Sequence, residues 1–241
     1  MLPVNIDYLN ILLEKFWAQE ELADSSISLN PDEQENEEYF KKTHCRNFEG
    51  KYVVRLPFKV KNKDDLEFPG SFEIASRMLT KMESRFEKDP TFHKLYLEFM
   101  SDYQSSDHMQ VKEHIDDVKS CYFLPHHGVL KKRSLKPKIC TVFNGSARDY
   151  NYLSINDVLH SGANLLPYLS NLLFNWMKYR YAFVSDIEHM FRQILIHEDD
   201  QKYQMILWRF DPQSRVSFWS LKTVTYGMIC SPFLAIRVSI R

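Results

Sequence analysis

The stretch FVSDIEHMFRQILI, residues 183–196, ends an apolar run on one acidic residue and places an aromatic residue five positions later. The acidic residue is Asp186 and the aromatic one is Phe191. An aspartate before a short helix is typical of an N-cap, and an aspartate at the end of a buried strand is also typical of a magnesium site. Taken alone, the stretch favours the N-cap for Asp186 and a core position for Phe191. The flanking sequence must decide whether either residue has a catalytic role.

Composition indicates a folded chain without a strong overall charge. The chain has 241 residues, 44% of them hydrophobic, which is enough for a substantial core. Its 31 basic and 32 acidic residues nearly cancel, so any affinity for nucleic acid must be local. The cysteines show no short paired spacing, which argues against a structural zinc site or a disulfide framework and favours a reducing compartment. They are Cys45, Cys121, Cys140 and Cys230.

No targeting or membrane segment is evident. The longest apolar runs fall short of the roughly 20 residues that a membrane span needs. The first ten residues, MLPVNIDYLN, lack the basic-then-apolar order of a signal peptide. We therefore expect an intracellular chain with no membrane partner.

Helical periodicity dominates before residue 120. Two stripes predict buried helix faces, namely Ile6, Leu9, Leu12, Leu13 and Phe16, and then Ala75, Met78, Leu79, Met82 and Phe86. Asp89-Pro90 is typical of a helix start, and the helix is expected to run through Phe99. The acidic stretch 31–40 predicts a helix whose first turns carry carboxylates, and the alternation of 50–59 predicts a short strand.

After residue 120 the pattern becomes mixed. Strands are predicted for KPKICTVFN (136–144), KYRYAFVSDI (178–187) and VSFWSLKTVTYG (216–227). Pro167 is expected to open a helix, and Ser231-Pro232 another. The first of these helices should bury a stripe made of Leu169, Leu172, Leu173, Trp176 and Met177. The fold class predicted for the chain is therefore α+β.

Four blocks, in this order, carry a family resemblance: CYFLPHHGVL, LSINDVLHSGANLLPYL, YAFVSDIEHMFRQILIHEDDQKYQMILWR and LKTVTYGMICSPFLA. They resemble the reverse transcriptase region of BEL/Pao-type LTR retrotransposon polyproteins. Upstream, FWAQEEL, HCRNFEGKYVVRLPFK and the helices to about residue 110 resemble the segment between protease and polymerase in that family. The resemblance implies a mainly helical connector over 1–119. Residues 120–241 would then be a partial reverse transcriptase domain, the fingers and first half of the palm of a right-hand polymerase.

The resemblance also implies roles for individual residues. Asp186, with the backbone carbonyl of Ile187, would bind the Mg²⁺ ions that activate the primer hydroxyl and steady the nucleotide phosphates. Phe191 would close against the ribose and select deoxynucleotides. Tyr226 and Gly227 would lie under the incoming nucleotide and template base, although without the resemblance a plain strand-end turn is the better explanation. The partners implied are a nucleic acid template-primer and a deoxynucleoside triphosphate.

One part of the metal site has no counterpart in this sequence. Two-metal catalysis needs a second carboxylate, which in the family comes from a paired-aspartate hairpin well downstream of Asp186. The sequence given ends at Arg241, so we expect a catalytically incomplete, truncated chain. Three Asp-Asp pairs occur at 64–65, 116–117 and 199–200, and none has the order and apolar flanks of that hairpin.

A second departure lies in KPKICTVFNGSA. The family usually has an arginine in place of Cys140 and an aspartate in place of Asn144. Lys138 lies on the same strand face as Cys140 and is a candidate for contacting the nucleotide phosphates instead. The basic loop 130–138 is either a template contact or a solvated turn. The adjacent pair His126-His127 is more typical of a loop or strand edge than of a zinc site.

Two hypotheses follow. In the first, the chain is a retrotransposon polyprotein fragment whose parent activity is Mg²⁺-dependent RNA-directed DNA polymerisation, located in the cytoplasm or in retrotransposon particles. In the second, it is a decayed or repurposed non-enzymatic protein that binds nucleic acid or another partner. We also expect an open strand edge and an apolar face in the palm, and self-association through them.

Overall fold

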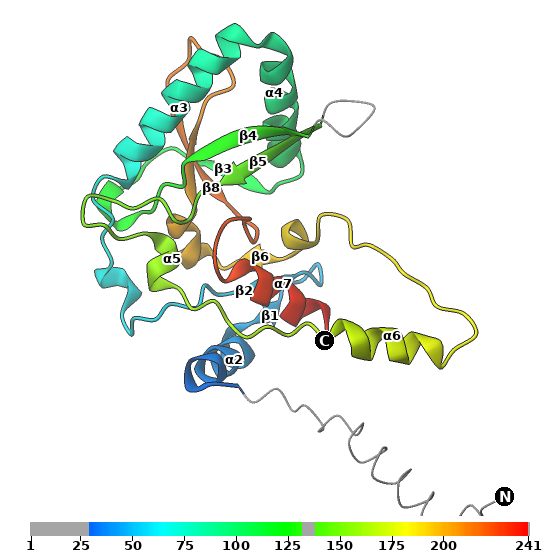
Figure 1. The fold of residues 1–241 in the computed structure, drawn as a ribbon. Helices are drawn as coiled ribbons and strands as arrows, with labels where there is room; N and C mark the ends of the chain where they lie inside the picture. The colour runs from blue at the N-terminus through cyan, green and yellow to red at the C-terminus, as the bar shows by residue number, and fades with distance from the viewer. Residues whose placement is uncertain (1–28, 132–137, 241) are drawn as a thin grey trace, which may run out of the picture.

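The computed structural model describes residues 29–131 and 138–240 and has an α+β fold (Figure 1). The apolar stripe predicted at Ile6–Phe16 lies outside the described residues. The α-helices are α2 (Pro31–Thr43), α3 (Ser71–Lys88), α4 (Pro90–Ser105), α5 (Ile155–Val158), α6 (Leu169–Met177) and α7 (Ser231–Ser239). Short 3₁₀ helices are η1 (Lys63–Asp65), η2 (Val118–Ser120), η3 (Met190–Gln193) and η4 (Glu198–Tyr203).

The strands form two small sheets and a hairpin. They are β1 (Cys45–Arg46), β2 (Tyr52–Val54), β3 (Met109–Lys112), β4 (His126–Lys131), β5 (Lys138–Phe143), β6 (Leu195–Ile196), β7 (Met205–Trp208) and β8 (Ser217–Leu221). The sheet orders are β1-β2-β6 and β3-β8-β7, and β4 pairs antiparallel with β5. β2 pairs parallel with β6, and β3 antiparallel with β8. Segments on both sides of residue 120 therefore share sheets, and the boundary at 119/120 stays a prediction.

Local sequence signals explain the first helices. Asn30 caps α2 in a capping box, because its side chain accepts from the Glu33 backbone and the Glu33 carboxylate accepts from the Asn30 backbone. Asp89 caps α4 by accepting from the Phe92 backbone at 2.9 Å, and Pro90 occupies the first helical position. Both predicted starts are confirmed, and α4 runs on to Ser105, beyond Phe99.

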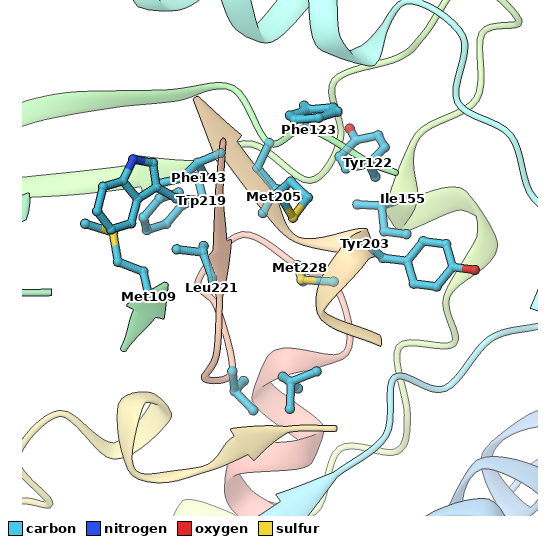
Figure 2. Close-up of a cluster of buried hydrophobic side chains, with 14 of the residues drawn as sticks. Met109, Tyr122, Phe123, Phe143, Ile155, Tyr203, Met205, Trp219, Leu221 and Met228 are labelled. Atoms are coloured by element: carbon cyan, nitrogen blue, oxygen red, sulfur yellow. The ribbon is translucent and has the colours of Figure 1, made fainter. Parts of the chain in front are cut away.

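The main core lies where α3 and α4 cover the sheets and the β4–β5 hairpin. Of the second stripe predicted above, Ala75, Leu79, Met82 and Phe86 are buried on α3. Figure 2 shows the part of the core around β7 and β8, where apolar side chains from distant segments meet. Burial of this apolar surface supplies the main driving force for folding.

Two sequence predictions for residues 165–187 are wrong. Residues 178–187 form no strand in the structure, and Phe183 is 90% exposed. The helix after Pro167 exists as α6, but none of its residues is buried. Periodicity predicts that a helix has an apolar face, but it does not show which part of the protein covers that face. In the described residues nothing buries the apolar face of α6.

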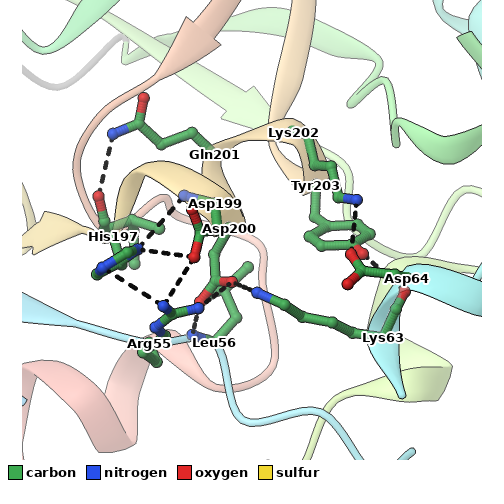
Figure 3. A network of polar contacts seen from close by, with 11 residues as sticks. Arg55, Leu56, Lys63, Asp64, His197, Asp199, Asp200, Gln201, Lys202 and Tyr203 are labelled. Carbon is green, nitrogen blue, oxygen red and sulfur yellow. Dashed lines mark hydrogen bonds and ion pairs between the residues drawn. The ribbon is translucent and has the colours of Figure 1, made fainter. Parts of the chain in front are cut away.

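A buried carboxylate joins the segment after β2 to η4. Asp200 is fully buried and accepts from the Leu56 backbone at 3.0 Å. Lys63 and Arg55 both form ion pairs with it (Figure 3). Arg55 also bonds the exposed Asp199 at 2.8 Å. Burying the charge of Asp200 costs free energy. The contacts with Leu56, Arg55 and Lys63 together offset this cost.

The buried side chain of His126 connects α4 to β7 through two hydrogen bonds. His126 is 3% exposed, and its Nε2 donates to the carbonyl of Leu207 at 3.0 Å. Its Nδ1 accepts from the hydroxyl of Tyr96. Burial lowers the pKa of His126 to about 4, so the ring is neutral at pH 7. The adjacent pair His126-His127 lies inside β4, and His126 has a structural position.

We predict that Asp200→Ala destabilises the protein by about 3–5 kcal/mol, because Arg55 and Lys63 lose their common buried partner. Asp199→Ala is the matched control, since it removes a neighbouring carboxylate whose exposed ion pair contributes less than about 1 kcal/mol. Urea unfolding followed by circular dichroism measures both. Equal losses for the two variants would contradict the role assigned to Asp200.

We also predict a loss of stability in acid that depends on His126. The folded-state pKa of about 4 lies below the value of about 6.5 in an unfolded chain, so between these pH values only the unfolded state takes up the proton. Stability therefore falls as pH drops from about 6.5 to 4, by about 3 kcal/mol in total.

Urea midpoints measured from pH 7.5 to 4.5 test this expectation. His126→Gln should be less stable at pH 7.5 and should have a flatter pH profile. His114→Gln should keep the profile of the unchanged protein, because His114 is exposed and is not among the groups that shift the pKa of His126. A profile that His126→Gln leaves unaltered would show that another group is responsible.

Candidate functional site

The Tyr226-Gly227 turn lies directly against the end of β5. Gly227 has φ +90°, and a Cβ built there would come within 1.9 Å of the carbonyl oxygen of Phe143. Glycine is the residue that tolerates this backbone conformation and this close approach. Two segments more than 80 residues apart in sequence therefore meet at backbone level.

Asn156 on α5 ties this turn to the loop that follows β5. Its Nδ2 donates to the carbonyl of Gly227 at 3.0 Å and to the hydroxyl of Ser146 at 2.8 Å. Its Oδ1 accepts from the Ile229 backbone at 2.8 Å, and its own backbone N–H donates to Gly145. Sequence reasoning assigned no role to Asn156, because a single asparagine in a short helix carries no sign of its distant partners.

Phe191 packs against Tyr226. The ring centroids are 4.8 Å apart at an angle of 58°. η3, which carries Phe191, is anchored to α4 by the next residue, Arg192. The guanidinium of Arg192 bonds Asp102 at 2.7 Å and lies 4.3 Å from the ring centre of Tyr103. The structure thus brings three predicted site residues together, Phe191, Tyr226 and Gly227, and adds Arg192, which sequence reasoning missed.

Asp186 and Ile187 lie in the exposed segment before η3, and in the described residues neither side chain bonds to this cluster. Asp186 is exposed, and in residues 29–131 and 138–240 it makes no hydrogen bond or ion pair. It is not the cap of the following helix, because the N-cap of η3 is His189, at φ +52°. The N-cap interpretation of Asp186 is therefore wrong. Ile187 is 51% exposed and lines a cavity of about 270 Å³ beside the end of α7.

Lys138 lies at the far end of the hairpin. It pairs with Lys131, whereas Phe143 at the other end of β5 pairs with His126. Five residues at about 3.4 Å each place Lys138 roughly 17 Å along the strand from the Gly227 turn. Lys138 and Cys140 are both exposed and alternate with the half-buried Ile139, so they share the outer face as predicted.

Asn144 lies beside the cluster at the end of β5. Its side chain accepts from the Ser146 backbone at 3.0 Å, and its backbone donates to Pro125 at 2.8 Å. This turn and the Tyr226-Gly227 turn form one floor of backbone groups, a half-buried tyrosine ring and the exposed amide of Asn144. Such a floor can stack a planar base and offer it hydrogen bonds, but it carries no charge of its own.

The three Asp-Asp pairs have other partners or positions. Asp64 bonds Lys202 at 3.0 Å, which lowers the pKa of its carboxyl. Asp117 caps η2, and Asp200 is enclosed in the network of Figure 3. In the part of the chain that the structure describes, no group of three or more His, Cys, Asp or Glu side chains is placed to hold a metal ion. Mg²⁺ binding at Asp186 stays a prediction.

Comparison with known proteins gives no assignment, since neither a family model nor a curated protein matches the sequence. In the described ranges, no helix has both the length and the apolar character needed to cross a bilayer.

We predict that Gly227→Ala costs at least about 2 kcal/mol of stability and loosens the cluster, because strain at positive φ adds to the clash with Phe143. Gly50→Ala is the matched control. Gly50 has a similar φ of +81°, but a Cβ there meets no atom within 4 Å. Its cost should be about 1–2 kcal/mol, from backbone strain alone. Urea unfolding of both variants measures the difference, and equal costs would contradict the close packing.

Proposed function

We propose that this chain is the connector, fingers and first half of the palm of a BEL/Pao-type reverse transcriptase, and that its parent activity is Mg²⁺-dependent, RNA-directed DNA polymerisation. The observation that supports this most directly is the contact between Phe191 and Tyr226 beside the Gly227 turn. The family resemblance assigns both aromatic residues to the nucleotide site. The two residues are 35 positions apart in sequence, and their rings are in contact in the structure.

The cluster has the chemistry that a nucleotide floor needs. Tyr226 is half-buried, Gly227 is exposed without a side chain, and Asn144 lies exposed at the end of β5. A base can approach the backbone closely at a glycine, and a tyrosine ring offers it a stacking partner. Phe191 on the other side of Tyr226 limits the space next to the ring, as a filter against a 2′-hydroxyl requires.

Asp186 would supply one carboxylate to the Mg²⁺ ions, with the carbonyl of Ile187 beside it. As an exposed carboxylate without a protein partner in the described residues, it is free to accept a hard cation. The Asp-Asp pairs of this chain are placed elsewhere, so a second carboxylate would have to come from outside the sequence given. We propose that this chain alone binds nucleotide and template-primer without extending the primer.

The alternative function is non-enzymatic binding of nucleic acid. The observation that favours it is the outer face of the β4–β5 hairpin, where Lys138 is exposed to solvent. The rest of the basic stretch, residues 132–137, lies outside the described residues. A phosphate contact there needs no metal and no nucleotide floor. The two functions differ in which residues carry binding, Tyr226 in the first and Lys138 in the second.

We predict that Tyr226→Ala weakens Mg²⁺-dependent binding of dTTP in the presence of poly(rA)/oligo(dT) about tenfold, because a stacking contact is lost. Tyr168→Ala is the control, since Tyr168 is 72% exposed and makes no ring contact with the cluster in the described residues. Fluorescence anisotropy of a labelled nucleotide measures both. Equal affinities for the two variants and the unchanged chain would contradict the proposed floor.

Two further measurements distinguish the two proposed functions. Lys138→Gln should lower the salt slope of template-primer binding by about one if the hairpin binds phosphate. Primer extension should be absent from the chain alone. Extension that Asp186→Asn abolishes would show that a second carboxylate is present, and would overturn the proposed incompleteness.

A further inference from the structure

Residues 165–188, here called the arm, expose more apolar surface than a folded monomer usually tolerates. Figure 1 shows α6 and the segment after it extending away from the rest of the chain. Six aromatic side chains lie exposed along the arm: Tyr168, Phe174, Trp176, Tyr179, Tyr181 and Phe183. At about 150–250 Å² each when fully exposed, and allowing for their fractional exposure, they present roughly 600–1,000 Å². A standard protein interface buries about 800 Å² per partner, so the arm is large enough for one.

The composition of the arm fits a protein partner. Interface cores are rich in Tyr, Trp, Phe, Met and Arg and poor in Lys and carboxylates. Between 165 and 188 the charged residues are Lys178, Arg180, Asp186 and Glu188, and they cancel. Nucleic acid and anionic lipid surfaces attract a net positive charge, which the arm lacks.

The backbone of the arm is also unpaired. In the described part of the chain, residues 180–187 make no backbone hydrogen bond, and all of them are exposed. Tyr, Phe, Val and Ile dominate 179–187, and these residues favour strands. An extended segment of this kind is open to pairing with another strand.

As an extended strand, residues 178–188 would place their side chains alternately on two faces, and Lys178 would have to leave the helical conformation that it has at the end of α6. The odd-numbered positions are Tyr179, Tyr181, Phe183, Ser185 and Ile187, and they make an apolar face as a strand. The even-numbered positions carry all four charges. If two copies of the segment pair antiparallel with Phe183 opposite itself, Lys178 faces Glu188 and Arg180 faces Asp186. Centring the pair on residue 182 or 184 leaves one of these basic residues opposite an uncharged side chain.

We propose that two copies of this chain associate through residues 178–188, paired antiparallel about Phe183. The two apolar faces then lie on the same side of the two-stranded ribbon, and the opposite charges pair on the other side. The exposed apolar residues of each α6 adjoin the ribbon and extend the covered surface. This dimer needs no metal and no nucleotide, but it places Asp186 opposite Arg180, so dimerisation and Mg²⁺ binding would compete for this carboxylate.

Sedimentation velocity of the full chain over about 1–100 μM tests the association, and charge variants test the register. Lys178→Glu or Glu188→Lys alone places like charges opposite each other twice in the dimer, and each should weaken association about tenfold. The double variant Lys178→Glu with Glu188→Lys should restore it. Lys81→Glu on α3, outside the arm, is the charge-matched control and should leave it unchanged. A monomer at every concentration, or a double variant as weak as the single ones, would overturn the proposal.

Cysteine cross-linking tests the centre of the pair directly. The exposed Cys45 and Cys140 are first replaced by serine. Phe183→Cys should then form an intermolecular disulfide on oxidation, because directly opposed Cα atoms lie about 4.5–5.5 Å apart. Tyr181→Cys should not, because its copies would lie about 13 Å apart along the ribbon. Equal cross-linking at both positions would exclude this register. Binding of the arm to single-stranded DNA or to anionic vesicles, with the chain still monomeric, would replace the proposed partner by that ligand.

Discussion

A single buried carboxylate links the stretch after β2 to the stretch after β6, where the two halves of the chain meet. Asp200 has no access to solvent, and its partners Leu56, Arg55 and Lys63 all come from one short stretch more than 130 residues earlier. This stretch follows β2, and Asp200 follows β6, the parallel neighbour of β2. The charge network therefore fixes the register at which the early strands join the later ones. η3, which carries Phe191, comes immediately before β6. The position of Phe191 therefore depends on the pairing of β6 with β2.

The candidate site is positioned by backbone contacts, and its chemistry comes from few side chains. Gly227 and the loop after β5 touch without a side chain between them, and Asn156 bonds to both. Phe191 reaches Tyr226 because Arg192 holds η3 against α4. Asp186 lies outside this framework, in the segment where the structure departs most from the sequence expectations. The floor and the predicted metal ligand thus depend on different parts of the fold.

Sequence predicted what depends on local periodicity and local caps. The α3 stripe, the Asp89-Pro90 start of α4, the start of α7 at Ser231 and the β5 strand are all present. It did not predict the roles of Asp200, Asn156 or Arg192, because each is defined by partners far away in the chain. It predicted an apolar face on α6 and a strand at 178–187, but burial and pairing require a second surface, and the described residues provide none. The resemblance named Phe191 and Tyr226, whereas their contact is known from the structure alone.

The exposed arm also has a topological consequence. The elements before it and after it are joined by β2–β6 pairing, by β3–β8 pairing and by the Asp200 network, none of which passes through the arm itself. A single cut in the backbone between residues 180 and 187 would leave all of these contacts in place. The residues before the arm and those after it are thus held together by non-covalent contacts. Once the chain has folded, the backbone of the arm is not needed to keep the two parts together.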